Sequence, residues 1–131
     1  MELRSLLEIS LYHDRDAGPA MSELYGEILG LREVARWPDG RALRLGQAVV
    51  LLFERERLAD REGPIADHGS SGPGHACFTV DADDYEAWRQ RVSARVEVVH
   101  EHEWPGGHRS FYFRDPAGNL LEIADGDLWP R

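Results

Sequence analysis

Three polar residues stand in strand-like segments at positions where apolar residues are expected. Glu8 is embedded in Leu-Leu-Glu-Ile-Ser-Leu, Glu122 is embedded in Leu-Leu-Glu-Ile-Ala, and His75 opens His-Ala-Cys-Phe-Thr-Val. A carboxylate held within a mostly buried sheet costs several kcal/mol unless it is paired or bound to a metal. Two carboxylates and one imidazole neutralise a dication and suit Fe²⁺, Mn²⁺, Zn²⁺, Ni²⁺ or Co²⁺. The three residues are therefore candidate ligands of one divalent metal ion.

The first half of the chain has the pattern of a strand, a helix and three strands. Alternating apolar residues predict the first strand, and apolar residues at helical spacing predict the helix, which Gly30 is placed to end. Pro38-Asp39-Gly40 is a turn signal between two of the later strands. In order, the expected elements are a strand over 5–13, a helix over 20–29 and strands over 31–37, 42–46 and 48–54.

The second half repeats this order of elements, although few residues match between the halves. Residues 55–72 carry charges, Gly and Pro without a sustained apolar period, and are expected to be a connector. We therefore expect one domain over 1–131, made of a module over 5–54, the connector 55–72 and a module over 73–124. The expected elements of the second module are a strand over 75–80, a helix after Asp81, and strands over 96–102, 110–114 and 119–124.

The repeat predicts how the three candidate ligands converge. Glu8 and His75 lie on the first strand of their modules, and Glu122 lies on the last strand of the second module. A pseudo-twofold arrangement would bring these strands around one cavity, and its fourth position falls at about Leu51, which cannot bind a metal. Three protein ligands leave open positions for water or substrate, as Lewis-acid catalysis requires.

Other interpretations of these residues are simpler. A single strand Glu or His is more often solvated or packed than bound to a metal. His100 and His102 share one strand face and form a rival pair of ligands, but the acidic residues around them favour a solvated strand end. Cys77 lies on the same strand face as His75 and is expected to be a small buried filler.

The bulk composition excludes several classes of protein. The 131 residues are 42% hydrophobic and 30% charged, which is typical of a globular domain. A net charge of −9, from 24 acidic and 15 basic residues, argues against nucleic acid as a partner. No apolar run is long enough to span a membrane, and no signal peptide is visible. A single cysteine fits a reducing cytoplasm.

Three segments carry a resemblance to the vicinal oxygen chelate superfamily, which includes glyoxalases, bleomycin-resistance proteins and extradiol dioxygenases. Residues 110–123, Ser-Phe-Tyr-Phe-Arg-Asp-Pro-Ala-Gly-Asn-Leu-Leu-Glu-Ile, resemble the closing hairpin that ends in that family's ligand glutamate. Residues 72–80 resemble the strand that carries its ligand histidine, and residues 24–31 resemble the end of its first helix. The resemblance implies an α+β fold in which two βαβββ modules form a cupped, incomplete barrel around a metal, and it implies a homodimer.

The resemblance assigns roles to the candidate ligands one position at a time. His75 and Glu122 match family ligands, whereas Glu8 occupies a position that is frequently His or Gln in the family. Leu51 departs from the four-ligand pattern of glyoxalase I, which has Glu there, and this departure argues against a lactoylglutathione lyase.

The function implied is that of a metal-dependent enzyme acting on a small substrate with two chelating oxygens. The metal would stabilise an enediolate or similar oxyanion, as in lyase, isomerase or dioxygenase chemistry, and Glu8 and Glu122 are the candidate catalytic residues. Strand alternation places Tyr12, Phe53 and Tyr112 on the faces of their strands that are expected to line the cavity. They are therefore candidates for substrate binding, with ordinary packing as the alternative.

Two other functions are compatible with the resemblance. The protein could bind and sequester a drug without catalysis, as a bleomycin-resistance protein does, and its acidic surface would suit a cationic ligand. A thiol transferase acting on fosfomycin is a weaker alternative, because no segment resembles the potassium-binding loop of that branch.

Overall fold

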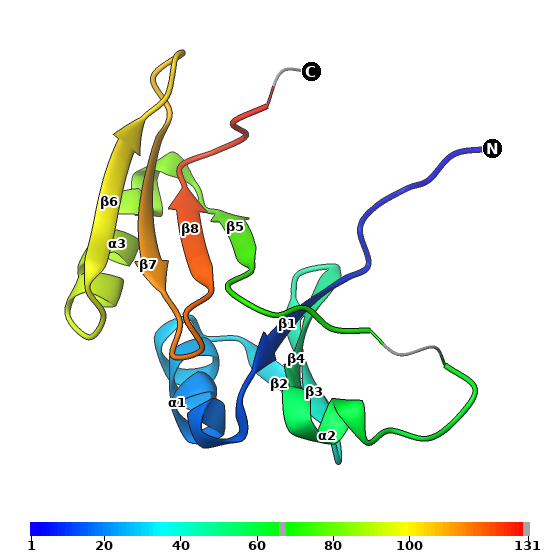
Figure 1. The fold of residues 1–131 in the computed structure, drawn as a ribbon. Helices are drawn as coiled ribbons and strands as arrows, with labels where there is room; N and C mark the ends of the chain where they lie inside the picture. Colours follow the sequence, from blue (N-terminus) through cyan, green and yellow to red (C-terminus); the bar gives the residue numbers. More distant parts are fainter. Residues whose placement is uncertain (66–67, 130–131) are drawn as a thin grey trace. The chain divides into compact units, whose positions relative to one another are not determined.

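The chain separates into two compact units in the computed structural model, which describes residues 1–65 and 68–129. The first unit covers Met1–Ser71 and the second covers Gly72–Arg131. Each unit contains one four-stranded sheet (Figure 1). That the two units form a single domain stays a prediction.

The first unit has the strand order β1-β4-β3-β2, with β1 parallel to β4 and the other neighbours antiparallel. The buried residues of β1 and β4 include Leu11, Val50 and Leu52, which point to one face because side chains alternate along a strand. Its elements are β1 (Glu8–His13), η1 (Arg15–Ala17), α1 (Gly18–Ser22), η2 (Glu23–Ile28), β2 (Arg32–Trp37), β3 (Gly40–Leu45), β4 (Ala48–Glu54) and α2 (Arg55–Ala59).

The second unit repeats this topology with the order β5-β8-β7-β6, in which β5 is parallel to β8. The rings of Tyr85 in α3 and Phe111 in β7 meet edge to face with centroids 5.6 Å apart, which places the helix against one face of the sheet. Its elements are β5 (His75–Thr79), η3 (Ala82–Asp84), α3 (Tyr85–Ser93), β6 (Val98–Glu103), β7 (Arg109–Arg114) and β8 (Leu120–Ala124).

The predicted α+β class and the two βαβββ modules are confirmed. Each described sheet remains open, with an edge strand on both sides. Within each unit the helical segment follows the first strand, because the parallel partners need a long crossover connection rather than a tight turn. Gly118, at φ 87°, lets the Asp115–Asn119 turn join β7 to β8, as its sequence indicates.

Two sequence predictions were wrong in detail. The helix expected over 20–29 begins at Gly18 as an α-helix and continues as a π-helix over Glu23–Ile28, where the amide of Leu29 donates to the carbonyl of Leu24. A π turn places the hydrogen bond one residue further along than the α spacing assumed from the sequence. In addition, β1 begins at Glu8 rather than at residue 5. The predicted connector over 55–72 follows the end of β4 at Glu54 and contains the short helix α2.

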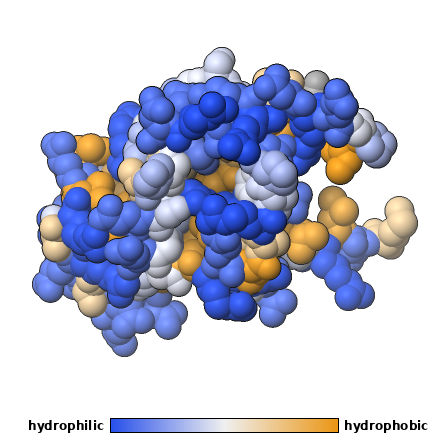
Figure 2. Space-filling view, turned by 90° about the horizontal axis from the view of Figure 1, so that it is seen from below, coloured by the Kyte–Doolittle hydropathy of each residue, from blue (hydrophilic) through white to orange (hydrophobic). Residues whose placement is uncertain are grey.

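The surface is mostly polar, in keeping with the net charge. Figure 2 shows one face of the molecule, on which hydrophilic residues predominate and apolar residues appear among them. The most exposed large apolar side chains include Met1, Leu3, Leu6 and Leu7, which precede β1. No helix among the described residues is long and apolar enough to span a membrane.

Asp125 joins the end of β8 to the beginning of β7. Its carboxylate is 8% exposed and accepts hydrogen bonds from the Arg109 amide at 2.9 Å and from the His108 ring at 3.1 Å. Burial alone would raise the pKa of Asp125, but the hydrogen bonds from Arg109 and His108 outweigh it and hold the pKa below its usual value.

Asp125→Asn should therefore lower the free energy of unfolding by about 1–3 kcal/mol at neutral pH, because charge-assisted hydrogen bonds are lost. A depressed pKa stabilises the fold above the pKa of the unfolded chain, and this contribution disappears as the pH falls through the folded-state pKa. The difference between wild type and variant should therefore shrink below pH ~4. Urea unfolding at several pH values measures this difference in the free energy of unfolding, and the substitution Asp83→Asn, at an exposed position, is the control. A difference that stayed constant into acid would contradict this explanation.

Candidate metal centre

The register of β5 and β8 brings His75 and Glu122 onto one face of the second sheet. His75 pairs with Leu120, and Cys77 pairs with Glu122 two residues further along. Because alternate residues point to the same side, His75, Cys77 and Glu122 project together, away from the face that carries Leu121 and Ile123. The two predicted ligands of this unit are thus neighbours.

The hydrogen bonding of His75 leaves one nitrogen of its imidazole ring free to bind a metal ion. His75 Nδ1 lies 2.9 Å from the carbonyl oxygen of Leu120, which can only accept a hydrogen bond, so Nδ1 carries the proton. In a neutral ring the lone pair then belongs to Nε2, and this atom lies 3.4 Å from Glu122 Oε2. A histidine oriented by a backbone carbonyl in this way is typical of metal ligands.

One oxygen of the buried Glu122 carboxylate lacks a hydrogen-bond partner within the described part of the chain. The Glu122 side chain is 6% exposed, and its Oε1 atom is buried with no hydrogen-bond partner among the described residues. An unpaired buried carboxylate costs several kcal/mol, which a bound cation would offset. The donor set of one imidazole nitrogen and one carboxylate therefore fits a divalent metal ion.

A hydrogen-bond network at the β7–β8 turn positions both ligands. Asp115 Oδ1 accepts from the amides of Ala117 and Asn119, both at 2.9 Å, and its Oδ2 accepts from Asn119 Nδ2 at 2.8 Å. Asn119 Oδ1 in turn accepts from the amide of Gly74 at 2.7 Å. The turn thus fixes the residues that directly precede His75 and Leu120. The Asp-Pro-Ala-Gly-Asn segment indicates the turn itself, but no local pattern indicates this role of Asn119.

Cys77 and Tyr112 flank Glu122 on neighbouring strands. Packing around the thiol, together with the adjacent Glu122 carboxylate, raises the pKa of Cys77 to about 12, so the thiol is protonated at neutral pH. The expectation that Cys77 is a buried filler was wrong, because the residue is exposed on the polar face of the sheet.

Tyr112 is a neutral hydrogen-bond donor beside the Glu122 carboxylate. Burial raises the pKa of Tyr112, a hydrogen bond with Ser110 opposes this rise, and Glu122 adds to it. The rings of Tyr112 and His75 stack with centroids 6.4 Å apart. Tyr112 is therefore placed next to the candidate ligands, and its predicted role in substrate binding stays a prediction.

Glu8 belongs to the first unit, and the structure corrects part of the argument for it. The residue is exposed at the start of β1 and is not held in a buried sheet. Its register nevertheless matches that of His75, because Glu8 pairs with Val49 as His75 pairs with Leu120. Leu51 therefore occupies the position in the first unit that Glu122 occupies in the second. Within either unit, over the described residues, no group of three His, Cys, Asp or Glu side chains gathers around a possible metal position. Glu8 as a third ligand stays a prediction.

Tyr12 and Phe53, the predicted substrate residues of the first unit, are neighbours in an aromatic cluster. Their ring centroids lie 6.0 Å apart, and the Tyr12 hydroxyl is hydrogen-bonded to His68 Nδ1 at 2.7 Å. Phe53 is 3% exposed and also contacts Trp37 and His68. Packing accounts for the position of Phe53, and substrate binding by either residue stays a prediction.

The rival ligand pair, His100 and His102, lies exposed on β6 with ring centroids 6.0 Å apart. His100 contacts the ring of Tyr112, and His102 contacts the ring of Trp104. Trp104 Nε1 donates to the buried Ser110 Oγ at 2.9 Å. Through these contacts, the sheet face that carries Glu122 and Tyr112 continues onto β6. The sequence did not reveal that the two pairs of residues share one face.

Known proteins resemble the chain over most of its length. Residues 16–123 match the family model of the Glyoxalase/Bleomycin resistance protein/Dioxygenase superfamily. Glutathione transferase FosA from Serratia marcescens is 35% identical over 106 residues, which cover 80% of this chain and 70% of the relative.

Solved structures share the fold. Lactoylglutathione lyase from Agrobacterium tumefaciens has a TM-score of 0.89 and 34% identity, covering 98% of both chains. The fosfomycin resistance protein FosX from Listeria monocytogenes, in a complex with Mn(II), has a TM-score of 0.71 and 18% identity, covering 97% of this chain and 94% of its own. At that identity the likeness to FosX concerns the fold alone.

The hydrogen bond from Gly74 to Asn119 predicts a local effect of substitution. Asn119→Ala should lower the free energy of unfolding by about 1–3 kcal/mol and make the Gly74 amide exchange faster with solvent, because its buried acceptor is lost. Native-state hydrogen exchange and urea unfolding measure both effects. Gln47→Ala, which removes an exposed amide between β3 and β4, is the control. Unchanged exchange at Gly74 would show that Asn119 does not hold the start of β5.

Proposed function

Because the chain belongs to the Glyoxalase/Bleomycin resistance protein/Dioxygenase superfamily, we propose that it is a divalent-metal-dependent enzyme acting on a small substrate with two chelating oxygens. The observation that carries this proposal is the pairing of His75 Nε2 with the under-coordinated, buried carboxylate of Glu122. A protein that only sequesters a drug has no need of such a pair. Fe²⁺, Mn²⁺, Zn²⁺, Ni²⁺ and Co²⁺ all suit these ligands.

The residues of the second unit have separable roles in this proposal. His75 and Glu122 would hold the metal, with Glu8 as the proposed third ligand. A divalent ion bound there would supply Lewis-acid polarisation of the substrate oxygens. The Leu120 carbonyl keeps the proton on His75 Nδ1, and Tyr112 offers a neutral phenol O–H as a hydrogen-bond donor to a substrate oxygen. Glu8 and Glu122 remain the candidates for moving a proton.

The relatives support a reaction that involves glutathione. One protein of 35% identity is named a glutathione transferase, and a structure of 34% identity is named a lactoylglutathione lyase. Leu51 in place of a fourth ligand favours the transferase over the lyase. We therefore propose a thiol transferase in preference to an isomerase or a dioxygenase, although from the sequence alone the thiol transferase was the weaker alternative.

In the proposed transfer, the sulfur of glutathione forms a bond to carbon of a small electrophile such as an epoxide. The C–O bond of the epoxide breaks, and the thiol proton passes to the released oxygen, so no oxidant or reductant is needed. A homodimer and a cytoplasmic location, both expected from the sequence, belong to the same proposal, and light scattering on the purified protein tests the dimer.

Metal content is the first test of the proposal. Protein purified without chelators should contain a stoichiometric divalent ion, and His75→Ala or Glu122→Ala should lose it. Each loss of affinity should exceed the roughly 10–100-fold that removal of an orienting neighbour costs. Elemental analysis and metal titration measure this. His102→Ala is the matched control on the same sheet, and if that variant alone lost the metal, the rival pair on β6 would be the site.

The role of Glu8 needs a separate variant. Glu8→Ala should weaken metal binding to an extent comparable with His75→Ala if Glu8 is the third ligand. Glu2→Ala, in the exposed segment before β1, is the control. Wild-type metal affinity in Glu8→Ala would remove Glu8 from the ligand set and leave the pair in the second unit intact.

The reaction class is tested with metal-loaded protein and glutathione. Fosfomycin as the electrophile should cause loss of free thiol, and Glu122→Ala should abolish it. Turnover of the methylglyoxal–glutathione adduct to a thioester instead would identify a lyase. Tight binding of a cationic drug by metal-free protein, without turnover of either substrate, would support sequestration.

A further inference from the structure

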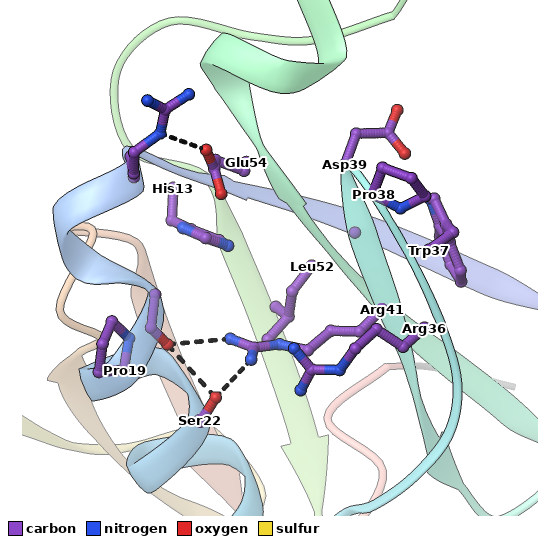
Figure 3. Close-up of a pocket in the computed structure, with 13 residues that line it drawn as sticks. His13, Pro19, Ser22, Arg36, Trp37, Pro38, Asp39, Arg41, Leu52 and Glu54 are labelled. Atoms are coloured by element: carbon purple, nitrogen blue, oxygen red, sulfur yellow. Dashed lines mark hydrogen bonds and ion pairs between the residues drawn. The ribbon is translucent and has the colours of Figure 1, made fainter.

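The first unit contains a cavity of about 330 Å³ beside α1, and neither Tyr12 nor Phe53 lines it (Figure 3). Residues of β3 and β4 form part of its wall, and Leu52 and Arg41 are register partners there. Tyr12 and Phe53 occupy the next register row and therefore point to the opposite face of the sheet. The cavity thus lies on the face that the predicted substrate residues do not use.

Arg41 places a buried positive charge in this cavity. The residue is 7% exposed, and Figure 3 shows its guanidinium reaching from β3 towards α1. One terminal nitrogen donates to Ser22 Oγ, and Nη2 donates to the Gly18 carbonyl at 3.1 Å. Both acceptors are neutral, and no carboxylate of the described residues forms an ion pair with Arg41. Burial, and then the charge of Arg36, lower the pKa of Arg41, and the charge of Glu33 opposes this lowering only in part.

The cavity's other charged side chains already have partners. Arg36 binds Glu33 through two hydrogen bonds of 2.8 and 2.7 Å, so its charge is compensated outside the cavity. Arg15 Nε lies 2.8 Å from Glu54 Oε1.

Asp39 also lines the cavity and is likewise paired. Its Oδ2 lies 2.7 Å from Arg61 Nε. The carboxylates of the lining residues are thus engaged by other arginines, and the excess charge near Arg41 is positive.

We propose that this cavity binds a small oxyanion, a carboxylate or a phosphate-type group, through the guanidinium of Arg41. A guanidinium has five N–H donors in a planar fork, and Arg41 uses two of them on Ser22 and Gly18. The fork matches the paired oxygens of carboxylates and phosphates, and a bound anion would offset the cost of burying the cation. Every residue in this site belongs to the first unit, and none of them is a proposed metal ligand.

The test is an anion titration of the full-length, isotope-labelled chain. Inorganic phosphate and acetate are added in separate series at constant ionic strength, and the Nε–Hε resonance of Arg41 is followed by NMR. A saturable shift is expected with at least one anion. Saturation by phosphate alone assigns a tetrahedral oxyanion, and saturation by acetate alone assigns a carboxylate. No saturable shift with either anion would overturn the proposal, and this measurement needs no variant to fold.

Three variants separate the cavity from general charge effects. Arg41→Gln should weaken anion binding at least about tenfold, which corresponds to about 1.4 kcal/mol. Arg44→Gln, on the same strand but on the opposite face, should bind as the wild type does. Glu122→Gln should also keep full anion affinity, whatever becomes of its metal. An equal loss in Arg41→Gln and Arg44→Gln would show non-specific attraction and overturn the site. A loss confined to Glu122→Gln would place the anion on the metal instead, and this too would overturn it.

Discussion

The parallel pairing between the first and last strands of each unit is the constraint on which the candidate site depends. In the second unit this pairing sets Cys77 opposite Glu122 and His75 opposite Leu120, so the imidazole and the carboxylate share one face. A slip of one residue would turn one of them towards the apolar core. The turn over 115–119, through the hydrogen bond from the Gly74 amide to Asn119, fixes the register of β5 and β8 at the residues where these two strands begin.

Among the described residues, two buried charges form no ion pair with a permanently charged group of opposite sign, and these two charges have opposite signs. Glu122 is a nearly inaccessible carboxylate whose nearest ionisable nitrogen belongs to His75, and Arg41 is a nearly inaccessible guanidinium bonded to neutral oxygens. Most other buried charges here are paired, as Asp39 is with Arg61 and Asp125 is with Arg109. Since unpaired buried charges are costly, both exceptions mark places where a ligand of the opposite charge would stabilise the protein.

Membership of the superfamily narrows the chemistry without fixing the reaction. Its members share a fold, and function is decided by the groups around the site. The likeness to a protein named a glutathione transferase and to a structure named a lactoylglutathione lyase is the reason for proposing thiol chemistry, and Leu51 in place of a possible ligand is the reason for preferring a transferase in that proposal. The Cys77 thiol lies beside Glu122, with its pKa raised to about 12, and is a neighbour of the proposed metal position.

The sequence by itself determined the order of the elements, the α+β class and the family, because strand alternation, helical spacing and the Asp-Pro-Ala-Gly-Asn turn are local signals. It also singled out His75 and Glu122 as polar residues in apolar strands. It did not reveal that Glu8 is exposed, that Cys77 is uncovered or that the first helix continues as a π-helix, because these depend on what packs against each segment. Only the tertiary structure brought Asn119 to Gly74 and Arg41 into a cavity beside α1, since contacts between residues distant in sequence depend on packing that no local pattern encodes.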